Sequence, residues 1–273
     1  MVERGGEGAR QAEALIESGY NAVYAGTPGS PTLRRLWHEH AEGLDFPDEF
    51  GHISFVTVRQ LRRMAVELRL GAGDTLVDLG CGRAGPALWM ARETGASLVG
   101  VDLSSVAVEQ ATGRAGELGL GERSRFVQGS FAETTLEASC ADGAMSEDAI
   151  QYAPDKRAAM VEAARNLREG GRFVFTVFEV DPERAAGLPG FSADPVSDYR
   201  PLLKEAGFDV DVYEGTSGWP EPMTAVYSAV VGARAALEKE MGEVATRALV
   251  LEMSMTLEQR PYLRRVLVAA TKK

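Results

Sequence analysis

The sequence predicts an α/β fold, with a mostly parallel sheet covered by helices on both faces. From about residue 75 to residue 178, short apolar runs of strand length alternate with segments of helical periodicity. This alternation requires crossover helices between parallel strands. The run from Arg172 to Phe178 is nearly continuous in apolar residues, which is typical of a strand buried on both faces.

Seven strands and the helices between them are expected in chain order. The expected strands are Thr75 to Leu79, Ser97 to Val101, Arg125 to Gln128, a segment ending at Gly143 to Met145, Arg172 to Phe178, Phe208 to Tyr213 and Arg264 to Ala270. The expected helices are Pro86 to Thr94, one capped by Ser104 with Val108, Ala111, Ala115 and Leu118 on one face, one beginning at Asp155 with apolar Ala158, Val161 and Leu167, and Asp198 to Ala206.

The chain is expected to divide at about residue 70, with an N-terminal helical cap over residues 1–70 and the sheet domain over 71–273. Within the first part, a loop from Gly43 to Gly51 separates two helical segments. Their apolar positions are Leu33, Leu36 and Trp37, and then Val58, Leu61, Met64, Ala65 and Leu68. A long, mostly helical insertion from about Gly215 to Tyr262 precedes the last strand and is a candidate wall of a substrate site.

Composition excludes several classes of function. The formal net charge of −11 argues against a nucleic-acid partner, which would require an excess of basic residues. No apolar run approaches the roughly 20 residues that span a bilayer, and no signal-peptide core is present, so a cytoplasmic protein is expected. Two cysteines fit a reducing compartment, and the three histidines lack zinc-ligand spacing, so no metal is expected.

The strongest functional signal is a glycine turn between the first expected strand and the next helix. It reads Val77-Asp78-Leu79-Gly80-Cys81-Gly82-Arg83-Ala84-Gly85-Pro86. Glycines at positions 80 and 82 allow a sharp turn and a close approach of a ligand to the main chain. Asp102 ends the second strand, where its carboxylate can accept hydrogen bonds from both ribose hydroxyls. A cofactor that contains a nucleoside is therefore predicted.

The residue before the turn distinguishes between two such cofactors. Gly80 to Gly85 satisfies the GxGxxG pattern of dinucleotide sites, so an NAD-dependent oxidoreductase is one alternative. The carboxylate of Asp78 would repel a pyrophosphate and attract a ligand that carries an ammonium and a sulfonium. This charge favours S-adenosylmethionine.

The order of the motifs resembles that of class I S-adenosylmethionine-dependent methyltransferases over about residues 70 to 180. These motifs are the glycine turn, Leu98 to Ser104, Phe126 to Phe131, Ala141 to Ser146 and Leu167 to Phe175. The lead-in from Tyr24 to Trp37 and the segment Ser146 to Lys156 are similar to the ubiquinone/menaquinone-type branch and its small-molecule relatives. The resemblance implies a Rossmann-like sheet with an antiparallel seventh strand, a lid made by the N-terminal helices, and in-line methyl transfer to a small-molecule acceptor in secondary metabolism.

The resemblance also implies which residues bind the cofactor. The turn would follow the methionine portion, Asp102 would bind the ribose, Leu103 would pack on the adenine and Gly129 to Phe131 would edge it. The complete expected cofactor set is Asp78, Gly80, Cys81, Gly82, Asp102, Leu103, Gly129, Ser130, Phe131 and Ser146. Many relatives carry an aspartate where Ser130 stands, so the contact with the adenine amino group lacks charge assistance here.

A methyl sulfonium is already activated, so the chemistry requires alignment of the reactants and, for some acceptors, a general base. The base candidates are Glu147 and Asp148, after the fourth strand, and His52, in the proposed lid. Either carboxylate can instead satisfy a neighbouring helix terminus. Aromatic and methionine residues in the lid and insertion point to an apolar or aromatic acceptor, or are simply core. A fold that binds the cofactor without catalysing a reaction is a third possible function.

Overall fold

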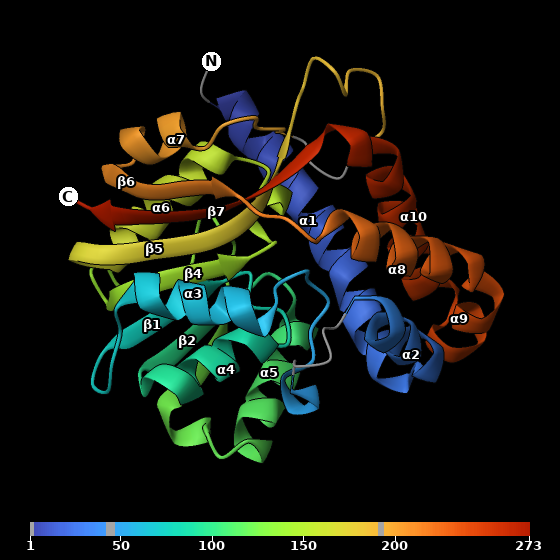
Figure 1. The fold of residues 1–273 in the computed structure, drawn as a ribbon, viewed down its shortest axis with the longest axis horizontal. Coiled ribbons are helices and arrows are strands. Elements are labelled where there is room, and N and C mark those ends of the chain that lie inside the picture. Colours follow the sequence, from blue (N-terminus) through green and yellow to red (C-terminus); the bar gives the residue numbers. More distant parts are fainter. Residues whose placement is uncertain (1–2, 42–46, 191–193) are drawn as a thin grey trace.

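The computed structural model describes residues 3–41, 47–190 and 194–273, and its centre is a seven-stranded sheet (Figure 1). The strand order is β3-β2-β1-β4-β5-β7-β6. Strand β7 runs antiparallel to both of its neighbours, and the other adjacent pairs are parallel, as predicted. The strands are β1 Thr75–Leu79, β2 Ser97–Asp102, β3 Ser124–Gln128, β4 Ala141–Glu147, β5 Leu167–Val180, β6 Phe208–Gly215 and β7 Leu263–Lys272.

Helices begin where the sequence supplies a capping side chain. Ser104 accepts a hydrogen bond from the Ala107 N–H, and Asp155 caps its helix in the same way, as expected for N-cap residues. The helices of the sheet domain are α3 Val58–Leu68, α4 Gly85–Thr94, α5 Ser105–Glu117, α6 Lys156–Asn166 and α7 Arg200–Glu205. The remaining helices are α1 Glu3–Gly26, α2 Pro31–His40, α8 Pro220–Gly232, α9 Arg234–Met241 and α10 Glu243–Gln259.

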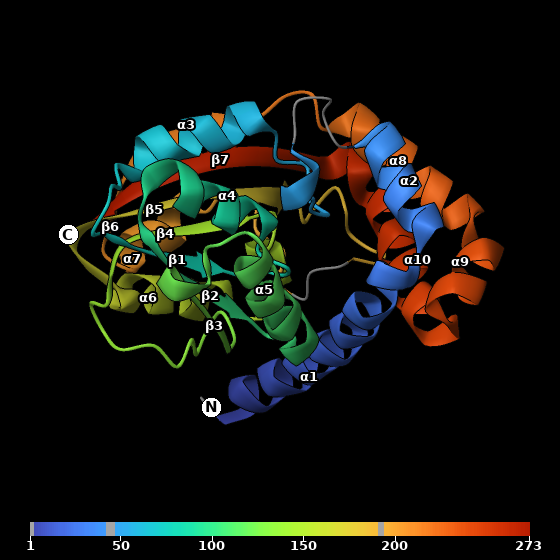
Figure 2. The ribbon, with the colours of Figure 1, turned by 90° about the horizontal axis from the view of Figure 1, so that it is seen from below.

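The sheet has a hydrophobic core on each face. Successive side chains of a strand point to opposite faces, so Leu76 packs with helices α3, α4 and α5, while its neighbour Val77 packs with α6 and α7. Both faces are therefore covered by helices, as Figure 2 shows in a second view.

Five helices from the two ends of the chain form one cap, defined here as α1, α2, α8, α9 and α10. They share a third core in which Leu33 and Trp37 of α2 pack with Tyr227 of α8. The Glu240 carboxylate of α9 also accepts hydrogen bonds from the Ser30 and Thr32 hydroxyls, at 2.6 and 2.7 Å. Figure 1 shows this cap at one end of the sheet.

Helix α3 lies on the sheet, although it was expected within an N-terminal cap. Leu61, Met64 and Leu68 are buried against the sheet, so the helical spacing was predicted correctly but not the surface it covers. The N-terminal helices that remain, α1 and α2, join the insertion instead of forming a unit of their own. The spacing of apolar residues along a helix shows which side of the helix is buried. It does not show whether that side packs on a sheet or on another helix.

The structure also differs from the sequence prediction in helix α6 and in the loop before α3. Val161 is half exposed and Leu167 opens strand β5, because α6 covers the sheet with Ala159, Met160 and Ala163. Residues 43–46 of the expected loop lie outside the described residues. The loop then continues as a 3-10 turn, Asp48–Phe50, which buries Phe50 completely.

We predict that Gly85→Ala destabilises the fold. A Cβ at position 85 would overlap the backbone carbonyl oxygen of Phe50, so the loop and the glycine turn would have to separate. The expected loss in the free energy of unfolding, measured with urea, is about 2 kcal/mol. The control is Gly113→Ala on the exposed side of α5, where no atom lies within 4 Å of the new Cβ, and it should gain about 0.5–1 kcal/mol. Equal stability of the two variants would contradict this account of the turn.

Candidate active site

A cavity of about 740 Å³ lies between the carboxyl ends of the central strands and the cap. Its sheet side comes from the ends of β1, β2 and β4, where parallel α/β sheets place their ligands. Eleven of the expected site residues line it: His52, Gly80, Cys81, Gly82, Asp102, Leu103, Gly129, Ser130, Phe131, Glu147 and Asp148. Segments far apart in the chain are thus brought to one place.

The glycine turn requires its glycines on geometric grounds. Gly80 and Gly82 have φ angles of +74° and +50°, in the left-handed region that side chains rarely adopt. A Cβ at Gly80 would lie 2.7 Å from the Ala149 Cβ, and one at Gly82 would lie 2.6 Å from the Tyr24 hydroxyl. The backbone is therefore held close to α1 and to the segment after β4.

Asp102 combines a structural role with a place on the cavity wall. Its carboxylate accepts the Gly82 N–H at 2.7 Å and the Ser104 N–H at 2.9 Å. Burial raises the pKa of Asp102, and these backbone N–H groups act in the opposite direction by stabilising the charge. Each carboxylate oxygen has a second lone pair, so acceptor capacity remains for a ligand.

Asp78 and Ser146 do not line the cavity with the other expected cofactor residues. Asp78 is 1% exposed and lies behind the turn, and Ser146 donates its hydroxyl to the Leu79 carbonyl at 2.6 Å. Burial, followed by the nearby charge of Asp102, raises the pKa of Asp78. One of its oxygens is buried without a hydrogen-bond partner among the described residues. Asp78 is therefore buried next to the turn, and its contact with the cofactor ammonium stays a prediction.

Ser130 and Phe131 lie together at the far end of the turn. The Ser130 hydroxyl oxygen accepts the Ala132 and Glu133 N–H groups at 3.3 and 3.1 Å, so it shapes its own loop. The Phe131 ring faces the cavity and lies against Gly80. Of these two residues, Phe131 offers the larger free surface for stacking.

The three candidate bases differ sharply in their surroundings. Glu147 faces the cavity, and one of its oxygens is buried without a hydrogen-bond partner among the described residues. Burial, with the charges of Asp78 and Asp148, raises its pKa well above the usual value. A carboxylate in this state can take up a proton from a ligand.

Asp148 is occupied by a buried ion pair. Its oxygens accept from the Arg265 guanidinium at 2.7 and 3.1 Å and from the Phe55 N–H at 3.0 Å. Both side chains are almost fully buried, and Asp148 has a φ of +51°. These contacts favour a structural role for Asp148 over a role as general base.

His52 lies on the cavity wall with one ring nitrogen engaged. Its Nδ1 accepts the Ser54 N–H at 3.1 Å, which places the proton of the neutral ring on Nε2. Burial lowers its pKa to about 4, so the ring is neutral near pH 7. The nitrogen that could accept a proton is engaged, and this geometry is poor for a base.

Cap residues that the sequence did not single out complete the lining. Tyr24 lies over the turn, and its carbonyl accepts from Gln110 at 2.8 Å. Glu252 of α10 accepts hydrogen bonds from Tyr152 at 2.7 Å and from Tyr20 at 3.2 Å. These residues lie on segments up to 232 positions apart, so no local pattern could have grouped them.

Comparisons with known proteins agree with this geometry. Residues 77–175 match a family described as "Methyltransferase domain". The chain is 29% identical over 218 residues to the 27-O-demethylrifamycin SV methyltransferase of Amycolatopsis mediterranei (strain S699), covering 76% of this chain and 78% of that protein. The chain spans only 62% of the length of methyltransferase GfsG of Streptomyces halstedii, and 52% of that of the sarcosine/dimethylglycine N-methyltransferase of Aphanothece halophytica.

Solved structures share the fold over nearly the whole chain. The [4+2]-cyclase SpnF superposes with a TM-score of 0.75 at 19% identity, covering 94% of each chain. The geranyl diphosphate C-methyltransferase of Streptomyces coelicolor A3(2), solved with S-adenosyl-L-homocysteine, superposes with a TM-score of 0.62 at 18% identity, covering 90% of this chain and 99% of that one. At such identities these likenesses show the fold alone.

The chain carries a methyltransferase domain over residues 77–175, and its fold and relatives support a class I, Rossmann-like S-adenosylmethionine-dependent methyltransferase. It is an enzyme that transfers a methyl group from S-adenosylmethionine to a small-molecule acceptor. The predicted fold class, cofactor and reaction are thereby confirmed, and the NAD-dependent alternative is not supported. None of the helices in the described ranges is long and apolar enough to cross a membrane.

We predict that Asp148→Asn costs about 3 kcal/mol of unfolding free energy, because it leaves Arg265 charged and buried without its partner. Thermal or urea unfolding measures the loss. Glu39→Gln, which removes the exposed pair between Arg35 and Glu39, should change stability by about 0.5 kcal/mol or less. If both substitutions had the same small effect, the Asp148 pair would not be a structural requirement.

Proposed function

We propose that the protein methylates a natural product or related secondary metabolite within the cavity under the cap. The observation that carries this proposal is the composition of the cavity, whose sheet side holds the glycine turn and whose cap side holds tyrosines and a glutamate. The rifamycin-type relative supports an acceptor of this class. Membership of the ubiquinone/menaquinone-type branch and a cytoplasmic location stay predictions.

The residues present fit S-adenosylmethionine. The turn leaves its backbone close to the cavity, Asp102 retains acceptor capacity for ribose hydroxyls, and Phe131 offers a ring for adenine. When bound, this cofactor supplies a methyl group made electrophilic by the positive sulfonium. Leu103 and Gly129 line the same wall and would limit how far the adenine can move.

The roles of the protein in catalysis are alignment, exclusion of water and proton removal. The Tyr24 hydroxyl lies against the glycine turn at Gly82, and the cap would shield the acceptor from solvent. Glu147 would accept the acceptor's proton, since its carboxylate faces the cavity. Its neighbour Asp148 would fix its position through Arg265, and His52 would donate a hydrogen bond.

An apolar or aromatic part of the acceptor fits the cap side of the cavity. Trp37 and Tyr227 line it, whereas Phe50, Phe55, Trp219 and Met223 serve as core. Four of these six aromatic and methionine residues therefore serve packing alone. The acidic net charge continues to argue against a nucleic-acid acceptor.

The substrate proposal is tested by incubating a bacterial metabolite extract with the enzyme and methyl-deuterated S-adenosylmethionine. An untargeted mass search should find a small molecule that gains a labelled methyl group. If label entered only macromolecules, the proposed acceptor class would be wrong.

We predict that Asp102→Asn weakens S-adenosylhomocysteine binding about 10- to 100-fold, measured by calorimetry. The amide loses the charge that strengthens hydrogen bonds to ribose hydroxyls and to the Gly82 N–H. Glu122→Gln, an exposed change of the same charge, should leave the dissociation constant unchanged. Wild-type affinity of the Asp102 variant would remove the residue from the proposed ribose site.

We predict that Glu147→Gln lowers kcat by about 100-fold or more while S-adenosylhomocysteine still binds. Because burial raises the pKa of Glu147, the base is protonated at low pH, and wild-type kcat should fall as the pH drops through that raised pKa. The matched control is Glu169→Gln, which is exposed and far from the lining. An unchanged kcat, or an acid limb that persists in the variant, would reject Glu147 as the base.

A further inference from the structure

The cap side of the cavity contains a carboxylate with no cationic partner. Glu252 lies on α10, reaches the cavity and is partly exposed there. Tyr152 donates to one of its oxygens at 2.7 Å and Tyr20 to the other at 3.2 Å. Among residues 3–41, 47–190 and 194–273, no lysine, arginine or histidine forms an ion pair with it.

The rings around Glu252 form a second element of the same subsite. The rings of Tyr20 and Tyr152 meet edge to face with centroids 5.7 Å apart. Burial, followed by the nearby charge of Glu252, raises the pKa of Tyr227. All three tyrosines line the cavity. Aromatic faces and a carboxylate favour a cation and offer little to a neutral or anionic group.

Burial without a counter-charge is unfavourable for a carboxylate, and two hydroxyl donors compensate for it only in part. Each Glu252 oxygen has one further lone pair for a donor from a ligand. A protonated amine would supply both the charge and the donors. The site is thus complementary to an ammonium group.

We propose that Glu252, Tyr20 and Tyr152 bind a positively charged amino group of the methyl acceptor. This inference rests on the proposed function, since it assumes that the acceptor occupies the cavity under the cap. The bound ammonium is not the atom that is methylated, because a protonated nitrogen has no lone pair to attack the methyl carbon. The acceptor is therefore an amine that carries a separate nucleophile.

The test uses the full chain saturated with S-adenosylhomocysteine, and two probes of similar shape, benzylammonium and benzyl alcohol. Wild-type protein should bind benzylammonium at least about tenfold more tightly than benzyl alcohol in calorimetry or ligand-observed NMR. In Glu252→Gln this preference should fall to about one, while affinity for S-adenosylhomocysteine stays within about twofold.

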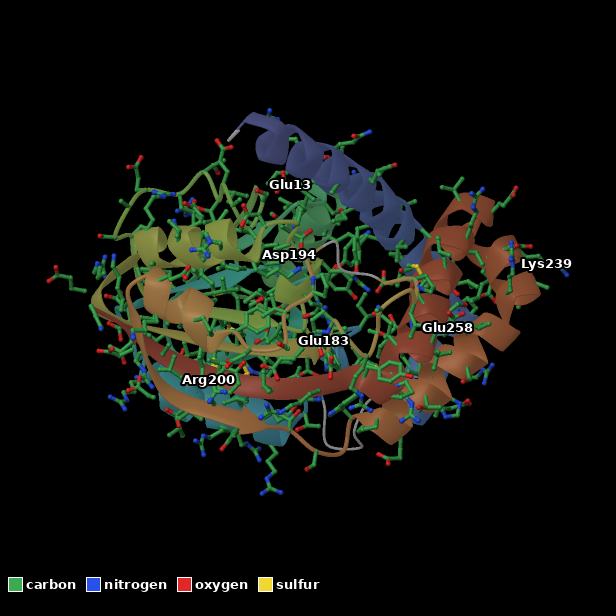
Figure 3. The ribbon with its side chains drawn as sticks, turned by 90° about the horizontal axis from the view of Figure 1, so that it is seen from above. Glu13, Glu183, Asp194, Arg200, Lys239 and Glu258 are labelled. Carbon is green, nitrogen blue, oxygen red and sulfur yellow. The ribbon has the colours of Figure 1, made fainter. Side chains whose placement is uncertain are left out.

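The matched control is Glu258→Gln on the same helix, at the residue labelled in Figure 3. Glu258 is exposed and does not line the cavity. The substitution removes the same charge from α10 and should keep the wild-type preference for the cation.

Three results would overturn the inference: equal binding of the two probes to wild type, an unchanged preference in Glu252→Gln, or a parallel loss of preference in Glu258→Gln. Loss of S-adenosylhomocysteine binding in a folded Glu252→Gln would also overturn it, because Glu252 would then belong to the cofactor. The wild-type comparison decides alone if that variant does not fold. Failure of wild type to bind S-adenosylhomocysteine would instead contradict the proposed function.

Discussion

The buried ion pair between Asp148 and Arg265 is the interaction on which the rest of the active site depends. It joins the carboxyl end of β4 to the start of β7 and holds the backbone at Phe55. Arg265 also donates to Gln60 of α3 and to Thr216, at the start of the insertion, each at 3.2 Å. A buried pair is tolerated only when its hydrogen bonds are satisfied, so these segments are held in one arrangement. Glu147, one residue before Asp148, takes its place in the cavity from that arrangement.

The wall of the cavity has two sides, which come from different parts of the chain. The sheet side comes from consecutive strand ends and is built around the backbone of the glycine turn, where side chains would not fit. The cap side comes from α1, α2, α8 and α10 and consists of side chains. Substitutions in the cap can therefore change which acceptor is bound without disturbing the turn, because the two sets of residues belong to different elements.

Local features of the sequence were sufficient for the fold and the turn. Alternating periodicities place the seven strands to within a few residues, and Gly80, Gly82 and Asp102 lie where a strand–turn–helix unit requires them. The surroundings of Asp78 could not be predicted in this way. Successive side chains of a strand point to opposite faces, so a shift of one residue changes what a side chain contacts. The Asp78 carboxylate is buried, and burial raises its pKa, an effect that the charge argument did not include.

Long-range features could not be predicted in the same way. The contact between Tyr20 and Glu252 spans 232 residues and carries no periodic signal. The destination of α3 was missed for a related reason, since an apolar stripe packs equally well on a sheet or on another helix.

The composite cap has a consequence for how the chain reaches its native state. The apolar sides of α1 and α2 pack on α8 and α10, which are synthesised about 200 residues later. Until α8 and α10 have been made, the sides of α1 and α2 that face them are uncovered, and exposed apolar surface of this kind promotes aggregation. The cap core can therefore form only after α10 is synthesised, and its formation closes the cavity over the glycine turn.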